Sequence, residues 1–146
     1  MATENVKIWS FLGGTLSIAL TIEEGKGVID YNARRAFHSG QCHALALAIN
    51  KLTGWPIKGV GDDDSDTADS PAHCLVYVPA LRRYLDIDGL STKPPRGWRV
   101  LNRRVTERAV NKFRYYLEPN VRAAKPFAKV LVQQVTEQIN NRANNP

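Results

Sequence analysis

Cys42 stands at a position where a cysteine can act as a nucleophile. It directly follows the letters SGQ and opens the apolar segment HALALAINKL, which has the composition of a helix. The first turn of a helix favours a thiolate, because its unpaired backbone N–H groups and the helix macrodipole stabilise negative charge. The same N–H groups can stabilise the oxyanion of a tetrahedral intermediate, a contribution of roughly 3–4 kcal/mol per donor. Cys42 is therefore the candidate nucleophile.

A base for this sulfur is expected on a β-hairpin near the middle of the chain. The stretches HCLVYV and RYLDID are rich in β-branched, aromatic and aliphatic residues, and PALR connects them, which is typical of a hairpin. A four-residue loop over 79–82 pairs Val78 with Arg83. Strands in that register place His73 opposite Asp88, and opposed residues of an antiparallel pair share a face.

These placements predict a catalytic triad of Cys42, His73 and Asp88. A histidine next to a cysteine can take the thiol proton, and a carboxylate next to the histidine can fix its tautomer and orientation. Asp86 shares the face of His73 two residues further along the hairpin. It is the second choice for the carboxylate.

Three neighbouring residues have other expected roles. Gln41 abuts the candidate nucleophile and is an alternative oxyanion donor. His43 is predicted at the surface or in a cap, with a reserve role as base. Cys74 is predicted to face away from His73 and to pack in the core, because successive strand residues point to opposite faces.

The elements that must position these residues fit into one α+β domain over 1–146, a length sufficient for one hydrophobic core. We expect an antiparallel sheet packed against the helix that carries the cysteine at its N-terminus, with further helices towards the C-terminus. The expected elements are an N-terminal hairpin over 5–31, the cysteine helix over 39–54, the His/Asp hairpin over 73–89 and basic helices over 103–143.

Local signals set these boundaries. The segment TLSIALTI alternates apolar and polar residues, which is typical of a half-buried strand. Ser39 is the expected N-cap of the cysteine helix and Gly54 its end. Pro126 is expected to start or kink the last helix, and NNRANNP is predicted to be a frayed tail. Five aspartates between 62 and 69 predict an extended loop, and the glycine and glutamate of an EF-hand are missing there.

A resemblance to the papain-like and transglutaminase-like cysteine hydrolase superfamily is carried by SGQCHALALAI, AHCLVYV and RYLDIDG, between Phe37 and Gly89. The chain is similar to its compact Cys-His-Asp members, as in bacterial effector or phage proteins. The resemblance implies a nucleophile that opens a helix on an antiparallel sheet, with base and carboxylate on adjacent strands. Carried over by position, Cys42 is the nucleophile, His73 the general base and acid, and Asp88 the orienting carboxylate.

The expected activity is that of a thiol hydrolase or acyl transferase, which forms a thioester on Cys42. Proteases, deamidases and transglutaminase-like enzymes belong to the resembling group, and the subtype stays open because the protease-type CGSCW is missing. The expected substrate is an amide of a partner protein: a peptide bond, an isopeptide bond or a glutamine side chain. No cofactor and no metal are expected, and the oligomeric state stays open.

Charge is distributed unevenly along the chain. Residues 1–90 carry 8 Lys/Arg against 11 Asp/Glu, whereas residues 91–146 carry 12 against 3. A basic segment of this kind suits an acidic protein, nucleic acid or a membrane surface. No apolar run reaches transmembrane length and no signal peptide is recognisable. Together with two cysteines, this predicts a cytoplasmic protein without a membrane partner.

Two other interpretations stay open. Cys42, His43, His73 and Cys74 make a formal Cys₂His₂ zinc set, although adjacent residues project to different sides of their element. The second alternative is a non-enzymatic binding module that holds an acidic protein or nucleic acid with its basic C-terminal helices. The stretch NRRVTERAVNKFRYYL offers arginines for phosphates and aromatic rings for stacking on bases. We rank nucleic-acid binding below catalysis.

Overall fold

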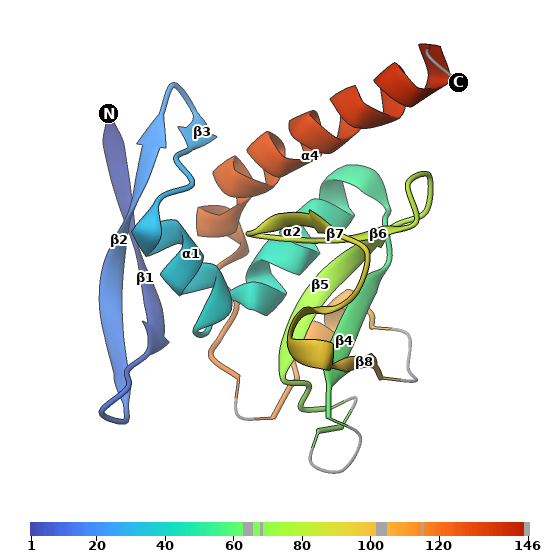
Figure 1. The fold of residues 1–146 in the computed structure, drawn as a ribbon. Coiled ribbons are helices and arrows are strands. Elements are labelled where there is room, and N and C mark those ends of the chain that lie inside the picture. Colours follow the sequence, from blue (N-terminus) through green and yellow to red (C-terminus); the bar gives the residue numbers. More distant parts are fainter. Residues whose placement is uncertain (63–65, 68, 102–104, 115, 145–146) are drawn as a thin grey trace.

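The computed structural model describes residues 1–62, 66–67, 69–101, 105–114 and 116–144. Two antiparallel sheets lie on either side of a pair of helices, and a long helix crosses above them (Figure 1). This is the expected α+β class, with antiparallel sheets and a helix at the C-terminus. The aspartate-rich stretch lies partly outside the described residues, at 63–65 and 68.

The N-terminal sheet has the strand order β1-β2-β3. Its strands are β1 (Ala2–Trp9), β2 (Thr15–Glu23) and β3 (Lys26–Gly27). One face buries Val6, Ile8 and Leu20 against the helices, and the alternate positions are largely exposed. The predicted hairpin is confirmed, but it ends at β3, because Tyr31 already begins a helix.

The second sheet has five strands in the order β7-β6-β5-β4-β8. They are β4 (Ile57–Gly61), β5 (His73–Val78), β6 (Arg83–Asp86), β7 (Gly89–Ser91) and β8 (Arg99–Val100). The predicted register of the central hairpin is confirmed, since Val78 pairs with Arg83. The sequence analysis does not predict β4. This strand pairs with β5 and places Val60 opposite His73, so His73 begins an interior strand.

The helices fill the space between and above the sheets (Figure 1). They are α1 (Tyr31–His38), α2 (Cys42–Thr53), α3 (Glu107–Val110) and α4 (Val121–Asn144), with a 3₁₀ turn η1 (Pro95–Gly97). Every residue of α2 from 42 to 49 is buried, because α2 packs on β5 on one side and on α4 on another. The chemistry predicted for the start of α2 would therefore take place at the edge of the core.

Helix α1 corrects the expected start of the cysteine helix. Asp30 caps α1, since its Oδ1 accepts from Ala33 N–H at 3.0 Å. Ser39 ends this helix and is not the N-cap of the next one; α2 begins three residues later without a side-chain cap. Gly54 ends α2 as expected, with a φ of +77° that suits glycine.

The C-terminal region contains less helix than predicted before residue 120 and more after it. Helix α3 has only four residues, and the expected helical positions 103–104 and 115 lie outside the described residues. Helix α4 continues through Pro126 and includes most of the predicted tail, to Asn144. The apolar stripe of α4 packs on α2. Once a helix has formed its first turn, each further residue adds one backbone hydrogen bond, which favours extension of α4 into the predicted tail. None of the described helices combines the length and apolarity needed to cross a membrane.

Candidate active site

Cys42 is the first residue of α2, and its side chain is 6% exposed. The first backbone bond of the helix runs from Leu45 N–H to the Gln41 carbonyl at 3.1 Å. The N–H groups of Cys42, His43 and Ala44 come before that bond, so the helical ladder does not use them. Together with the macrodipole, they create positive potential at the sulfur.

Gly40 allows strand β1 to cross close to this turn. Its φ is +142°, and a Cβ atom there would lie 3.2 Å from Ile8 Cα and 3.3 Å from Trp9 N. Trp9 N–H also donates to the Ser39 carbonyl at 2.7 Å. The glycine in SGQC is therefore required by a close backbone approach, and this contact holds the start of α2 against the N-terminal sheet.

The carboxylate next to His73 belongs to Asp86. His73 is 3% exposed, and its Nε2 lies 3.0 Å from Asp86 Oδ2. The other oxygen, Asp86 Oδ1, accepts from the N–H of Asp88 at 2.9 Å, which fixes the carboxylate in its orientation. Because Asp86 uses Nε2, Nδ1 remains the ring atom available to a sulfur.

Asp88 is not paired with His73 in the sheet, which corrects its expected position. Strand β6 ends at Asp86 and the chain turns back at once, so that Asp86 pairs with Gly89. Asp88 lies in this turn and does not extend the ladder beside β5. Its carboxylate instead forms an ion pair with His38 Nε2 at 2.8 Å. Asp86, the second choice from the sequence, is therefore the carboxylate bonded to His73.

Cys42 and His73 are neighbours that stabilise opposite charges. A hydrogen bond from Cys74 is the largest cause that holds the pKa of Cys42 well below its usual 9.0, against the opposing effect of burial. A hydrogen bond with the ring of His73 and the charge of that ring lower this pKa further. Burial would lower the pKa of His73, but hydrogen bonds with Asp86 and Cys42 and their charges raise it to about 10. These opposite shifts favour the charged thiolate–imidazolium pair over the neutral thiol and imidazole.

Cys74 contacts the sulfur of Cys42. The side chain is 1% exposed, which confirms its expected place in the core. Burial is the main cause that raises the pKa of Cys74, and the neighbouring Cys42 sulfur adds to it. Cys74 therefore stays protonated and can donate its S–H to the Cys42 thiolate. Its Sγ also lies 4.0 Å from the hydroxyl of Tyr116, which donates to the Pro71 carbonyl at 2.7 Å.

His43 is fully buried, so its expected surface position is wrong. The reason is the central place of α2, which leaves its first turns no exposed side. His43 Nε2 donates to the Leu117 carbonyl at 2.6 Å, and the ring packs edge-on against Tyr116. A carbonyl only accepts, so Nε2 holds the hydrogen and Nδ1 has the lone pair. Within the described residues Nδ1 has no hydrogen-bond partner, and its reserve role as base stays a prediction.

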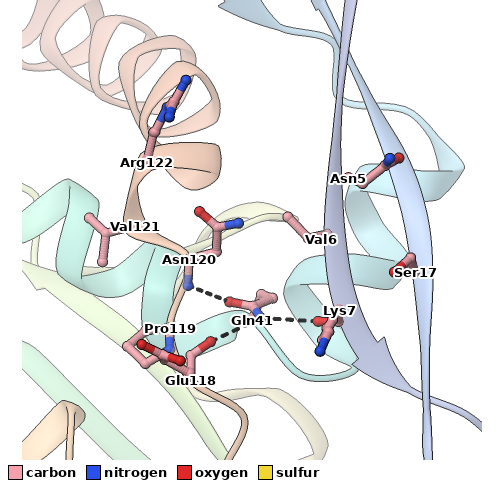
Figure 2. A pocket seen from close by; sticks show the side chains of 10 residues that line it. All are labelled: Asn5, Val6, Lys7, Ser17, Gln41, Glu118, Pro119, Asn120, Val121 and Arg122. Carbon is pink, nitrogen blue, oxygen red and sulfur yellow. Dashed lines mark hydrogen bonds between the residues drawn. The ribbon is translucent and has the colours of Figure 1, made fainter.

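The Gln41 side chain holds the fold together and is not available to an oxyanion. It is 1% exposed; Nε2 donates to the carbonyls of Lys7 at 3.0 Å and Glu118 at 3.4 Å, and Oε1 accepts from Asn120 N–H at 3.0 Å. Figure 2 shows these bonds at the centre of a pocket of about 600 Å³ between β1 and the segment 118–122. Gln41 thus joins three parts of the chain at the start of α2.

We expect Gln41→Ala to affect stability more than chemistry. Two carbonyls and one N–H would lose a buried partner, so the free energy of unfolding in urea should fall by about 2–4 kcal/mol. The rate at which the folded variant is acetylated on Cys42 by p-nitrophenyl acetate should stay within about threefold of wild type, because backbone N–H groups are the expected oxyanion donors. Native stability combined with a large loss in acetylation would instead return the oxyanion role to Gln41.

A surface pocket of about 610 Å³ opens next to the histidine, and we call it the His73 pocket. It is lined by His38, Ser39, Ala72, His73, Asp88, Pro95, Arg96 and Trp98. The ring of His38 stacks on His73 with centroids 5.7 Å apart, and the Trp98 ring lies 6.3 Å from His73. The pocket gives a substrate direct access to the imidazole.

Cys42, His73 and Asp86 thus form one cluster built from α2, β5 and β6. No family model, curated protein or solved structure matches this chain. The roles within the cluster therefore depend on its geometry, and membership of the papain-like superfamily stays a prediction.

Sequence reasoning missed the residues that surround the cluster, His38 above all. One signal was present: Asp30 followed by apolar positions at 33, 36 and 37 has the pattern of a capped helix that ends near His38. No comparable signal marked Trp98 and Arg96 as pocket residues, because a loop brings them to His73 from a distant part of the chain.

The two alternative interpretations find limited support in this geometry. Among the described residues, no group of three or more His, Cys, Asp or Glu side chains is arranged to hold a metal ion. The aromatic rings expected to stack on bases are engaged inside the protein: Phe113 is 8% exposed, and Tyr116 packs on Phe113 and His43. Tyr115 lies outside the described residues. Basic side chains such as Arg122 remain exposed on α4, so an acidic protein partner stays possible on this side.

Proposed function

We propose that this protein is a cysteine-dependent hydrolase or acyl transferase that acts through a thioester on Cys42. The proposal is supported by the bond between His73 Nε2 and Asp86 at 3.0 Å, together with the electrostatic coupling of this ring to the Cys42 thiol. The pKa of the thiol is lowered and that of the imidazole is raised, so the pair is charged before any substrate binds. A charged pair of this kind is the reactive form of a nucleophilic cysteine.

In the acylation step, the Cys42 thiolate attacks the carbonyl carbon of an amide and a C–S bond forms. The electron pair of the carbonyl moves to its oxygen, and the free N–H groups at the start of α2 can stabilise this oxyanion. His73 gives its proton to the leaving nitrogen as the C–N bond breaks. The amine departs, and the acyl group remains on Cys42 as a thioester.

In the second step, neutral His73 accepts a proton from the attacking nucleophile. Water as nucleophile forms the carboxylic acid, whereas an amine forms a new amide; in both cases the C–S bond breaks and the thiolate is restored. His73 then holds its proton again, and Asp86 keeps the ring in the tautomer with hydrogen on Nε2. Asp86 thus serves both steps without being protonated.

The substrate that suits this chemistry best is an amide of a partner protein, either in the main chain or in a glutamine side chain. The His73 pocket is open at the surface and large enough for one or two side chains. The exposed cations of α4, among them Arg122, offer an acidic partner a second place of contact. The choice between protease, deamidase and acyl transferase depends on which nucleophile reaches the thioester.

Alkylation with iodoacetamide tests the charged pair. We expect Cys42 to react at least ~100-fold faster than Cys74 at pH 7, because Cys42 is a thiolate and Cys74 a buried thiol. The rate at Cys42 should rise with pH through an apparent pKa below 9.0, the usual value of this thiol. Peptide mapping by mass spectrometry gives both rates. Equal and slow labelling of the two cysteines would remove the basis for the proposal.

The covalent intermediate can be captured with p-nitrophenyl acetate, a generic acyl donor. The expected result is one acetyl group on Cys42, with steady release of p-nitrophenol as the thioester is hydrolysed. An amide substrate should lose acylation as the pH rises past about 10, where His73 loses the proton that the leaving amine needs; p-nitrophenolate leaves without a proton and should not show this loss. Prior alkylation of Cys42 should abolish the release, and a Cys74→Ala variant with its nucleophile intact should still be acetylated.

A further inference from the structure

The His73 pocket contains side chains that the proposed reaction does not use. Its lining comes from the end of α1, the start of β5 and the segment of η1 and Trp98. His73, the proposed acid and base, is part of this lining, so a group bound in the pocket lies next to its ring. Side chains of η1 are therefore well placed to select the substrate.

Arg96 in η1 has a backbone conformation that non-glycine residues avoid. Its φ is +56° and its ψ 21°, in the left-handed region. The other described non-glycine residues with positive φ, Glu24 and Arg82, lie in hairpin turns, where such values are common. Arg96 lies in no hairpin. Strain of this kind is found preferentially at functional positions, and here it holds an arginine at the edge of the pocket.

The guanidinium of Arg96 lies over an aromatic face. Its Cζ lies 5.4 Å from the centroid of the Trp98 ring. Trp98 in turn lies against His73, with ring centroids 6.3 Å apart. Arg96 and His73 thus share the Trp98 ring as a neighbour. A guanidinium stacked on a ring still directs its N–H groups outward in a fork that matches a carboxylate.

The charges around the pocket are paired except at this position. Asp86 is bonded to His73, and Asp88 is paired with His38 at 2.8 Å. Within the described part of the chain no carboxylate pairs with Arg96, although its side chain is exposed. The pocket thus presents one cation that no carboxylate of the described residues neutralises.

We propose that Arg96 is a specificity-determining residue that binds a carboxylate of the substrate next to the bond attacked by Cys42. This inference rests on the proposed cysteine hydrolase or acyl transferase function. The carboxylate can belong to an aspartate or glutamate side chain or to a chain terminus. An acidic substrate also suits the cations of α4, which lie exposed elsewhere on the surface.

Three matched electrophiles test the proposal. N-iodoacetyl-glutamate α-amide presents a side-chain carboxylate, N-iodoacetyl-glutamine presents only a terminal carboxylate, and N-iodoacetyl-glutamine α-amide has nearly the same shape without charge. The rate of alkylation of Cys42 is measured with each probe, and the quantity compared is the ratio of a charged probe to the neutral one. The proteins are wild type, Arg96→Gln, Arg96→Lys and Lys93→Gln. Lys93 lies in the same loop outside the pocket lining and controls for the loss of one positive charge.

We expect Arg96→Gln to lower the ratio about 5- to 20-fold for at least one charged probe, and the probe affected identifies the source of the carboxylate. Arg96→Lys should keep part of the ratio, and Lys93→Gln should leave it within about twofold of wild type. A ratio that does not change in Arg96→Gln, or falls equally in Lys93→Gln, overturns the inference and leaves the proposed function intact. A Cys42 that fails to react with the neutral probe overturns both. Far-UV circular dichroism and the urea midpoint of each variant should match wild type, because misfolding would also abolish the preference for a charged probe.

Discussion

A His73→Gln variant is expected to lose steady hydrolysis of p-nitrophenyl acetate by a factor on the order of 10²–10⁴, the usual contribution of a general acid and base. Glutamine keeps a polar side chain of similar size next to Asp86 but cannot accept or return a proton at neutral pH. Deacylation suffers most, since water has to lose a proton as it attacks the thioester. The measurement is p-nitrophenol release together with the mass of the intact protein, which should show accumulated acetyl-enzyme.

His38→Gln is the matched control for this variant. His38 also lies at the pocket and stacks on His73, but its own bond is to Asp88 at 2.8 Å. The exposed His38–Asp88 pair is worth little, so we expect hydrolysis to fall less than about fivefold. Equal losses in the two variants would mean that the stacked pair of rings, and not proton transfer by His73, supports the reaction. Full activity in His73→Gln would leave His43 as the base.

Asp86→Asn and Asp88→Asn are expected to differ strongly, with a loss on the order of 10²–10⁴ in the first and less than threefold in the second. Asp86 holds Nε2 of the buried His73 ring and is the carboxylate that helps raise the pKa of His73 to about 10. Asparagine can present an N–H to that nitrogen and so favour the wrong tautomer. Asp88 is exposed and bonded to a different histidine.

The pH dependence separates this role from a structural one. Loss of the Asp86 charge removes a cause that raises the pKa of His73, so the imidazolium should lose its proton well below pH 10 in Asp86→Asn. Titration of the His73 ring by NMR gives this value directly. In Asp88→Asn the ring should titrate as in wild type, while the His38 signal moves. An unchanged His73 titration in Asp86→Asn would contradict the arrangement described here.

The lowered pKa of Cys42 has a further consequence for how the nucleophile is protected. Cys42 is 6% exposed, and its sulfur interacts with the S–H of Cys74, whose pKa is raised by burial. A sulfur anion in such surroundings depends on its hydrogen bonds, since transfer of an unpaired charge into an apolar interior is costly. The positive end of α2, Cys74 and His73 together supply that stabilisation. The start of the helix thus combines reactivity with limited access to solvent.

Local patterns were sufficient to predict the elements that carry the cluster. The alternation in TLSIALTI and the proline-containing connection in PALR are short-range signals, and they predicted two hairpins, including the pairing of Val78 with Arg83. The end of the cysteine helix at Gly54 is equally local, because a left-handed φ favours glycine. Such features depend on residues that are close in the chain.

The identity of the carboxylate in the cluster depended on where strand β6 ended. Extension of the hairpin register beyond Leu85 places Asp88 opposite His73, and this holds only if β6 continues. The chain instead turns at residues 87 and 88 to form β7, an event governed by the pairing of Asp86 with Gly89. Two residues of strand length therefore decide between Asp86 and Asp88.

The burial, hydrogen bonds and ring contacts around the cluster depended on tertiary packing. The burial of His43, the use of Gln41 as a bridge between β1 and segment 118–122, and the approach of Trp98 to His73 join residues more than 20 positions apart. No local propensity encodes such contacts, because they follow from how the two sheets enclose α2. The amino-acid sequence by itself determined which residues can do chemistry and which elements hold them. Only the packing of those elements determined their partners, since pKa values and hydrogen bonds respond to neighbours in space.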